Sequence, residues 1–183
     1  EWNFIDFSGD DYHRHYGTLM FSGPILSNLF YAASTTFGTE NVSTISNLTK
    51  LSLSFYPIKK ASVGFSGVYA SGSNGALDPF RGFSSQTAVL ASETAGFGTE
   101  YDGKIKTMLT GSYTFLSNIC VAPSLALVFA CPEKISYNGF QWRLDAMWNI
   151  FHDLQLSSSI YQYIGKDKEN DKICFSLGGT FVF

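Results

Sequence analysis

The chain has 183 residues, of which 45% are hydrophobic, 16% aromatic and only 15% charged, and its formal net charge is −3. This length corresponds to about one domain, so we expect residues 1–183 to form a single domain. The weak negative charge excludes a basic nucleic-acid-binding surface, and the apolar and aromatic content excludes a disordered chain. A typical soluble domain carries about 25% charged residues, so this chain lacks the charged surface of a soluble protein.

Hydrophobic residues alternate with small or polar ones along most of the chain, and this period of two predicts β-strands. The alternation is clearest at 139–149, where Phe140, Trp142 and Leu144 share one face while Arg143 and Asp145 lie on the other. We expect ten strands, in chain order 2–8, 15–22, 28–37, 50–55, 62–69, 104–115, 119–129, 139–149, 154–164 and 173–183.

One segment has to be tested as a membrane-spanning helix, because residues 107–132 contain no charged side chain. A stretch of this length could span a bilayer as a helix. However, Leu116-Ser117-Asn118 has turn character, Pro123 lies inside the second half, and the first half alternates strictly. We therefore expect a β-hairpin here.

The strand lengths and connections favour a transmembrane β-barrel. Each spanning strand needs about 9–11 residues, and outer-membrane barrels have short turns at one end and longer loops at the other. Short connections lie near 23–24, 57–60, 116–118 and 151–153, and longer polar ones at 9–12, 38–46, 72–103, 131–138 and 165–172. We expect an all-β, antiparallel up-and-down barrel with its apolar faces toward lipid, its small and polar faces toward the lumen, and both chain ends at the short-turn side.

The last expected strand carries a family resemblance. Its alternating residues Phe175, Leu177, Phe181 and the terminal Phe183 resemble the C-terminal strand of bacterial outer-membrane β-barrel proteins. The resemblance implies a location in the bacterial outer membrane, contact with membrane lipid, and an assembly signal that the barrel-insertion machinery reads. A narrower similarity of residues 8–11 to alginate-export-type porins implies that this chain is the C-terminal portion of a larger barrel; the alternative is a complete barrel of about ten strands. This similarity carries no assignment of a substrate.

Two groups of charged residues are candidates for controlling a pore. The long connection 72–103 could fold into the lumen and narrow it, or it could be a plain surface loop; its charged residues are Asp78, Arg81, Glu93, Glu100 and Asp102. Five further charges lie on the polar strand faces, where charge sets selectivity at close range; they are Lys50, Lys104, Lys106, Arg143 and Asp145. For Arg143 and Asp145 the alternative is a structural pair, and for Lys104 and Lys106 the alternative is a position at the rim.

Aromatic residues gather near the expected strand ends, as in the girdles of membrane barrels. The girdle candidates are Tyr56, Tyr69, Tyr101, Tyr113, Phe115, Phe129, Phe140, Trp148, Tyr161, Tyr163 and Phe183.

The expected inner faces are rich in serine, threonine and glycine. This composition favours an outer-membrane channel for small hydrophilic solutes over an enzyme. A surface adhesin or anchor is the first alternative. The second is a protease that resembles the omptins, because Asp11 and His13 could form a rim general base, although the opposed acidic pair of that family is missing. No metal or organic cofactor is implied, and the oligomeric state stays open.

Overall fold

The computed structural model describes residues 2–9, 12–40, 44–72, 103–116, 118–130, 134–151, 154–166 and 171–181. These residues form ten strands of one sheet. In chain order the strands are β1 (Trp2–Gly9), β2 (Tyr12–Leu26), β3 (Leu29–Glu40), β4 (Thr44–Ile58), β5 (Ala61–Ala70), β6 (Lys104–Phe115), β7 (Ile119–Ala130), β8 (Ser136–Asn149), β9 (Leu154–Gly165) and β10 (Lys172–Phe181).

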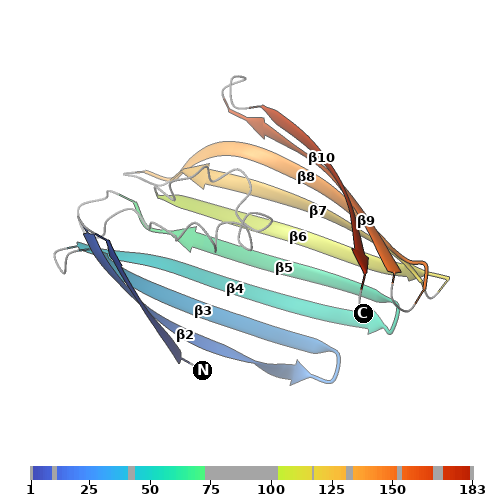
Figure 1. Ribbon diagram of the computed structural model, residues 1–183, viewed down its shortest axis with the longest axis horizontal. Coiled ribbons are helices and arrows are strands. Elements are labelled where there is room, and N and C mark those ends of the chain that lie inside the picture. The colour runs from blue at the N-terminus through green and yellow to red at the C-terminus, as the bar shows by residue number, and fades with distance from the viewer. Residues whose placement is uncertain are drawn as a thin grey trace.

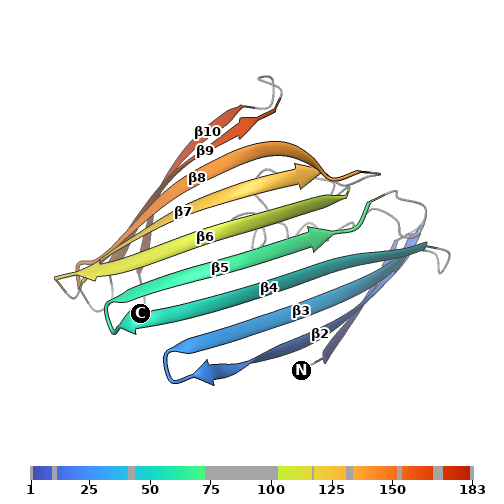
Figure 2. The same cartoon turned by 180° about the vertical axis from the view of Figure 1, so that it is seen from behind.

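Each strand pairs antiparallel with the strand that precedes or follows it in the chain, in the order β1 to β10. The number of strands and the up-and-down order agree with the prediction. Within the described residues β1 and β10 each pair with a single neighbour, so this part of the chain forms an open, curved sheet. Figure 1 looks into its concave side, with β1 and β10 at the two rims, and Figure 2 shows the convex side.

The segment that could have been a membrane helix is a hairpin, as predicted. It belongs to β6 and β7, whose tight turn is closed by the backbone N–H of Asn118 donating to the carbonyl oxygen of Phe115 at 3.2 Å. Leu116 in this turn has a φ of 47°, which is the left-handed region. The described residues contain no helix that is long and apolar enough to cross a membrane.

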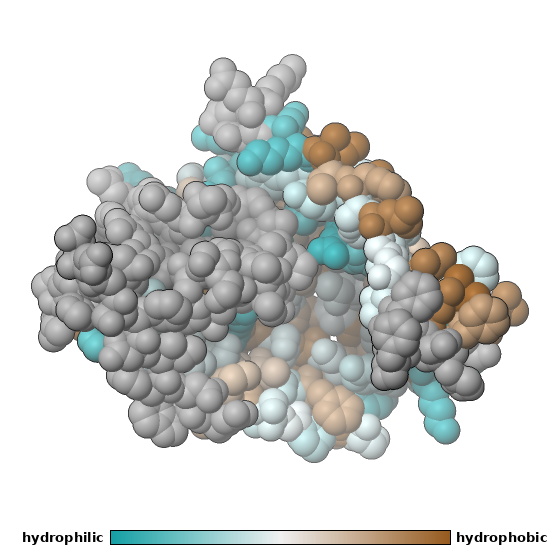
Figure 3. Space-filling model, viewed as in Figure 1, coloured by the Kyte–Doolittle hydropathy of each residue, from teal (hydrophilic) through white to brown (hydrophobic). Residues whose placement is uncertain are grey.

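The large apolar side chains lie on the convex face. At the centre of this face Phe65 and Leu109 are directly paired, and they stay 53% and 52% exposed. By contrast, the buried hydrophobic cluster lies on the concave face and consists of Tyr16, Leu48, Val68, Ala70, Val128 and Tyr163. Leu144 and Phe175, which would pack centrally in a soluble sandwich, are 40% and 68% exposed. Hydrophobic groups also gather along the rim formed by β10 (Figure 3). The prediction that the apolar faces point outward is therefore confirmed.

The eighth strand begins three residues earlier than its alternation predicts. The register between β7 and β8 shifts between Val128 and Phe129, so Phe129 pairs with Tyr137. Their rings pack edge to face with centroids 6.3 Å apart. A β-bulge interrupts the period of two, which explains why the sequence pattern places the start of this strand at 139.

Candidate pore-lining face

The strand register brings distant polar residues together on the concave face. Residues directly opposite one another in an antiparallel pair point to the same side of the sheet. Lys50 on β4 pairs with Val68 on β5, and Val68 pairs with Lys106 on β6, so the two lysines flank one valine. Lys104 lies two residues from Lys106 on the same face, and further along the sheet Gln141 and Arg143 of β8 share it.

Lys106 is an almost fully buried cation. Its side chain is 1% exposed, and its Nζ donates to Oε1 of Gln141, which is itself 3% exposed, at 2.9 Å. Burying a charge is costly unless hydrogen bonds hold it. The hydrogen bond to Gln141 therefore gives the Lys106 side chain a polar partner within the wall. Lys106 is the third residue of β6, so its burial does not decide between a place in the lumen wall and one near the rim.

Arg143 and Asp145 form an ion pair along the same strand. The Arg143 Nη2 lies 2.8 Å from Oδ1 of Asp145, and Nε donates to the same oxygen at 2.9 Å. Their side chains remain 25% and 37% exposed, so solvent screens the attraction and the pair adds little stability. The contact neutralises one of the cations of this face locally, while both groups stay accessible to a passing solute.

Two tyrosines that the sequence suggested for an aromatic girdle lie on the concave face instead. Tyr161 pairs with Arg143, and Tyr163 pairs with Gln141, so both point to the polar side. The girdle assignment of Tyr161 and Tyr163 is wrong because β9 is rich in serine and glutamine, which blurs the distinction between its two faces. The girdle pair Tyr113 and Phe115, by contrast, packs edge to face near the short-turn end.

The sequence analysis missed one further cation on this face. Lys172 pairs with Tyr163 at the start of β10. Alternation along β10 could have found it, since Lys172 precedes Cys174 and Ser176 at intervals of two. Among the described strand side chains the concave face thus carries five cations and one acidic group; the cations are Lys50, Lys104, Lys106, Arg143 and Lys172, and the acid is Asp145.

Hydroxyl groups cover much of the remaining concave face. Pairs of opposed side chains form hydrogen bonds across strands, as Ser62 does with Ser112 at 2.7 Å and Thr18 with Thr36 at 2.8 Å. Such pairs present a neutral, hydrophilic wall without long side chains. This composition is suited to contact with hydrated solutes.

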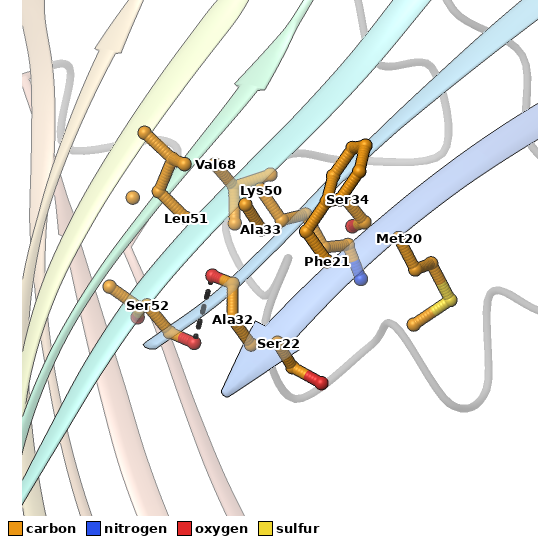
Figure 4. Close-up of a pocket in the computed structure, with 12 residues that line it drawn as sticks. Met20, Phe21, Ser22, Ala32, Ala33, Ser34, Lys50, Leu51, Ser52 and Val68 are labelled. Atoms are coloured by element: carbon orange, nitrogen blue, oxygen red, sulfur yellow. Dashed lines mark hydrogen bonds between the residues drawn. The ribbon is translucent and has the colours of Figure 1, made fainter. Parts of the chain in front are cut away.

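A hollow of about 350 Å³ lies on this face over β2 to β5. Figure 4 shows the side chains around it, with Lys50 extending from β4 among residues of β2 and β3. Its lining residues are Met20, Phe21, Ser22, Ala32, Ala33, Ser34, Lys50, Leu51, Ser52, Ser66, Gly67 and Val68.

The convex face holds one polar cluster that the sequence did not reveal. The Nδ2 of Asn47 donates to Oγ1 of Thr35 at 2.9 Å, and Oγ1 of Thr49 donates to Oδ1 of Asn47 at 2.9 Å. Asn47 is 7% exposed. Because these groups satisfy one another, the amide is tolerated on a face whose large side chains are mainly apolar.

Several predicted residues lie outside the described part of the chain. They are the loop residues Asp78, Arg81, Glu93, Glu100 and Asp102, the rim residue Asp11 and the terminal Phe183. The side chains of His13 and Phe181 are also not described. Of the proposed assembly signal, Phe175 and Leu177 lie on the apolar side of β10 and are 68% and 74% exposed. No group of three His, Cys, Asp or Glu side chains that could hold a metal ion occurs among the described residues.

The described strands form an open, curved meander. Apolar side chains that are compatible with lipid lie on its outside, and hydroxyls and cations lie on its inside. This chain therefore has the fold of a porin-type outer-membrane β-barrel. Among the solved structures that share this fold are two of KdgM porins. One is a KdgM porin in complex with disordered oligogalacturonate, with a TM-score of 0.56 and 8% identity over 97% of this chain and 80% of that chain. The other is a KdgM porin with the same TM-score and identity, over 100% of this chain and 91% of that chain. No family model and no curated protein matches the sequence.

Proposed function

We propose that this protein is a non-enzymatic channel of the bacterial outer membrane through which small hydrophilic solutes pass, and that it prefers anions. The observation that carries the proposal is the contrast between the two faces of one sheet. Apolar side chains such as Phe65 and Leu109 remain half exposed on the convex side, whereas the concave side carries hydroxyls and a surplus of cations. A porin contacts lipid with its outer surface and water with its lumen, so it needs one apolar face and one polar face.

The anion preference follows from the charge of the wall. Five cations against one acid give the described concave face a positive charge, although the whole chain carries −3. Fixed charges that line a confined passage concentrate ions of the opposite sign and exclude ions of the same sign. Lys50, Lys104, Lys106 and Arg143 would attract anions, and Asp145 would moderate Arg143. The similar porin whose structure is a complex with oligogalacturonate, a polyanion, supports this specificity.

The terminal strand and the long connection have separate proposed roles. Phe175 and Leu177 supply the exposed apolar side of β10, which supports a role of this strand as the signal for the barrel-insertion machinery and in contacts with lipid. The connection between β5 and β6 is proposed to narrow the passage. Deleting residues 73–102 should then raise the single-channel conductance, and an unchanged conductance would remove this proposal. The comparisons offer no support for an adhesin or a protease.

The test of the main proposal is reconstitution in planar bilayers under a gradient of potassium chloride. We expect single-channel currents and a reversal potential whose sign reports faster passage of chloride than of potassium. Replacing both Lys50 and Lys104 by methionine should move the reversal potential toward potassium. The matched control is Lys59→Met, because Lys59 lies in the exposed turn between β4 and β5. Absence of conductance from correctly folded protein would refute the channel.

A further inference from the structure

We propose that β1 and β2 hold a binding site for a divalent transition-metal ion of the zinc type, formed by Asp6, His13 and His15. These residues lie near the end of the sheet opposite the short turns, on the two strands that form one rim (Figure 1). The site belongs to the outer surface of the sheet, and the proposal does not depend on the channel function.

The two histidines share one face of one strand. A single residue of β2 separates His13 from His15, and successive residues of extended backbone alternate between the two faces of a sheet. Tyr16 belongs to the buried cluster of the concave face, so its neighbour His15 lies on the convex face, and His13 does too. The two positions are about 7 Å apart along the strand.

Asp6 joins the histidines through the pairing of β1 with β2. The register sets Asp6 directly opposite His15, and His13 is its diagonal neighbour. Directly opposed residues share a face with their Cβ positions about 4.5–5.5 Å apart, and diagonal neighbours are about 7–8 Å apart. The backbone register thus gathers two imidazole residues and one carboxylate residue in a triangle on the convex face. It also sets Ser8 opposite His13, at the edge of this triangle.

Two imidazoles and one carboxylate form a ligand set that binds zinc and leaves one coordination position open. Imidazole suits Zn²⁺ and similar ions, whereas Ca²⁺ and Mg²⁺ prefer oxygen ligands. Ligand atoms lie only about 2.0–2.2 Å from a zinc ion, so they must come from closely spaced positions, as in this triangle. The chain has three histidines, and only His152 lies outside the triangle. The chain therefore contains its own comparison residue.

The triangle lies where the apolar part of the convex face ends. The next positions toward the short turns are Gly17 on β2 and Phe37 on β3, followed by Leu19 on β2. Phe37 and Leu19 are 50% and 46% exposed. If this apolar part contacts lipid, the triangle lies at the level of water and headgroups, where an ion can enter from solution. A bound ion would tie β1 to β2, which is its single pairing partner within the described residues.

The experiment titrates zinc chloride into untagged, folded, detergent-solubilised protein and measures the heat of binding, with calcium and magnesium chloride as comparison ions. We expect Zn²⁺ to bind and the comparison ions not to compete. His15→Ala and Asp6→Asn should each weaken binding by about 100-fold or more, because loss of groups that only orient metal ligands already costs about 10–100-fold. His152→Ala should leave the affinity unchanged, since His152 lies between β8 and β9, at the short-turn end. Absence of Zn²⁺ binding, or full affinity in Asp6→Asn, would overturn the site.

A variant of unchanged composition tests the shared face. Arg14→His combined with His15→Arg keeps the same residues but moves one imidazole to the concave face. Zn²⁺ binding should weaken as much as in His15→Ala. Unchanged affinity would show that the face is irrelevant and would contradict the proposal.

Chemical modification of the natural protein tests the site without any variant that has to fold. Diethylpyrocarbonate modifies accessible imidazole nitrogens, and mass spectrometry of peptides locates the modified residues. Zn²⁺ should protect His13 and His15 from modification and leave His152 reactive. Protection of all three histidines alike, or of none, would refute the site.

Discussion

Replacing a central apolar residue of the convex face by arginine tests whether this face contacts lipid. Leu109 lies in the middle of β6, between Phe65 of β5 and Leu125 of β7, and 52% of it is exposed. On a water-exposed sheet, arginine at such a position would be nearly neutral. In a bilayer, arginine at the midplane of the lipid face costs about 2–4 kcal/mol.

The loss of the leucine side chain itself adds a second contribution to the free-energy cost of Leu109→Arg. Fully burying a leucine side chain in an apolar medium is worth about 1.5–3 kcal/mol, and half of Leu109 is available to lipid, so its loss costs about 1 kcal/mol. Leu109→Arg should therefore destabilise the protein by about 3–5 kcal/mol in lipid. The matched control is Met108→Arg, which places the same side chain one residue away on the concave face and should cost less than about 1 kcal/mol.

The assay is guanidinium unfolding of protein folded into lipid vesicles, with the heat-dependent shift in gel mobility as a check that each variant has folded. Equal costs for the two variants would refute the assignment of the faces. A larger cost for Met108→Arg than for Leu109→Arg would mean that the two faces are reversed.

Three further substitutions test the concave face and one turn. Asp145→Asn leaves Arg143 without its ion-pair partner, so the reversal potential should shift further toward chloride, with a change in stability below about 1 kcal/mol. Gly139→Ala would drive a Cβ into the phenol of Tyr163, and the displaced ring should cost about 1–3 kcal/mol in guanidinium unfolding. Leu116 is 81% exposed and has a φ of 47°, so Leu116→Asn should raise the unfolding free energy by about 1 kcal/mol, because asparagine tolerates the left-handed conformation better.

Each of these three substitutions has a matched control variant and a result that would contradict the reasoning behind it. Asp145→Glu should keep the reversal potential of the natural protein, and an unchanged potential in Asp145→Asn would show that the pair does not face the passage. Gly17→Ala meets nothing within 4 Å and should be neutral, so an equal cost at both glycines would contradict the packing argument. Leu116→Ile should destabilise the turn, and a gain in stability would contradict the role of φ.

The sequence by itself determined the strands and the direction of their faces. A period of two is a property of each strand alone, since successive side chains of extended backbone point to opposite sides. The scarcity of charge then decided which side meets lipid, and the structure agrees at Leu144 and Phe175. The hairpin in place of a helix at 107–132 also followed from local residues, namely its turn and Pro123.

Only the tertiary structure decided which residues of different strands meet. The alternation places Lys50 and Lys106 on a polar face, but only the hydrogen-bond register sets both beside Val68. Such register depends on ladders between segments far apart in the chain, and a slip of one residue would exchange the faces. For the same reason Tyr163 on the concave side could not be assigned from the weakly alternating β9, and the contact of Asn47 with Thr35 and Thr49 could not be seen in any single strand.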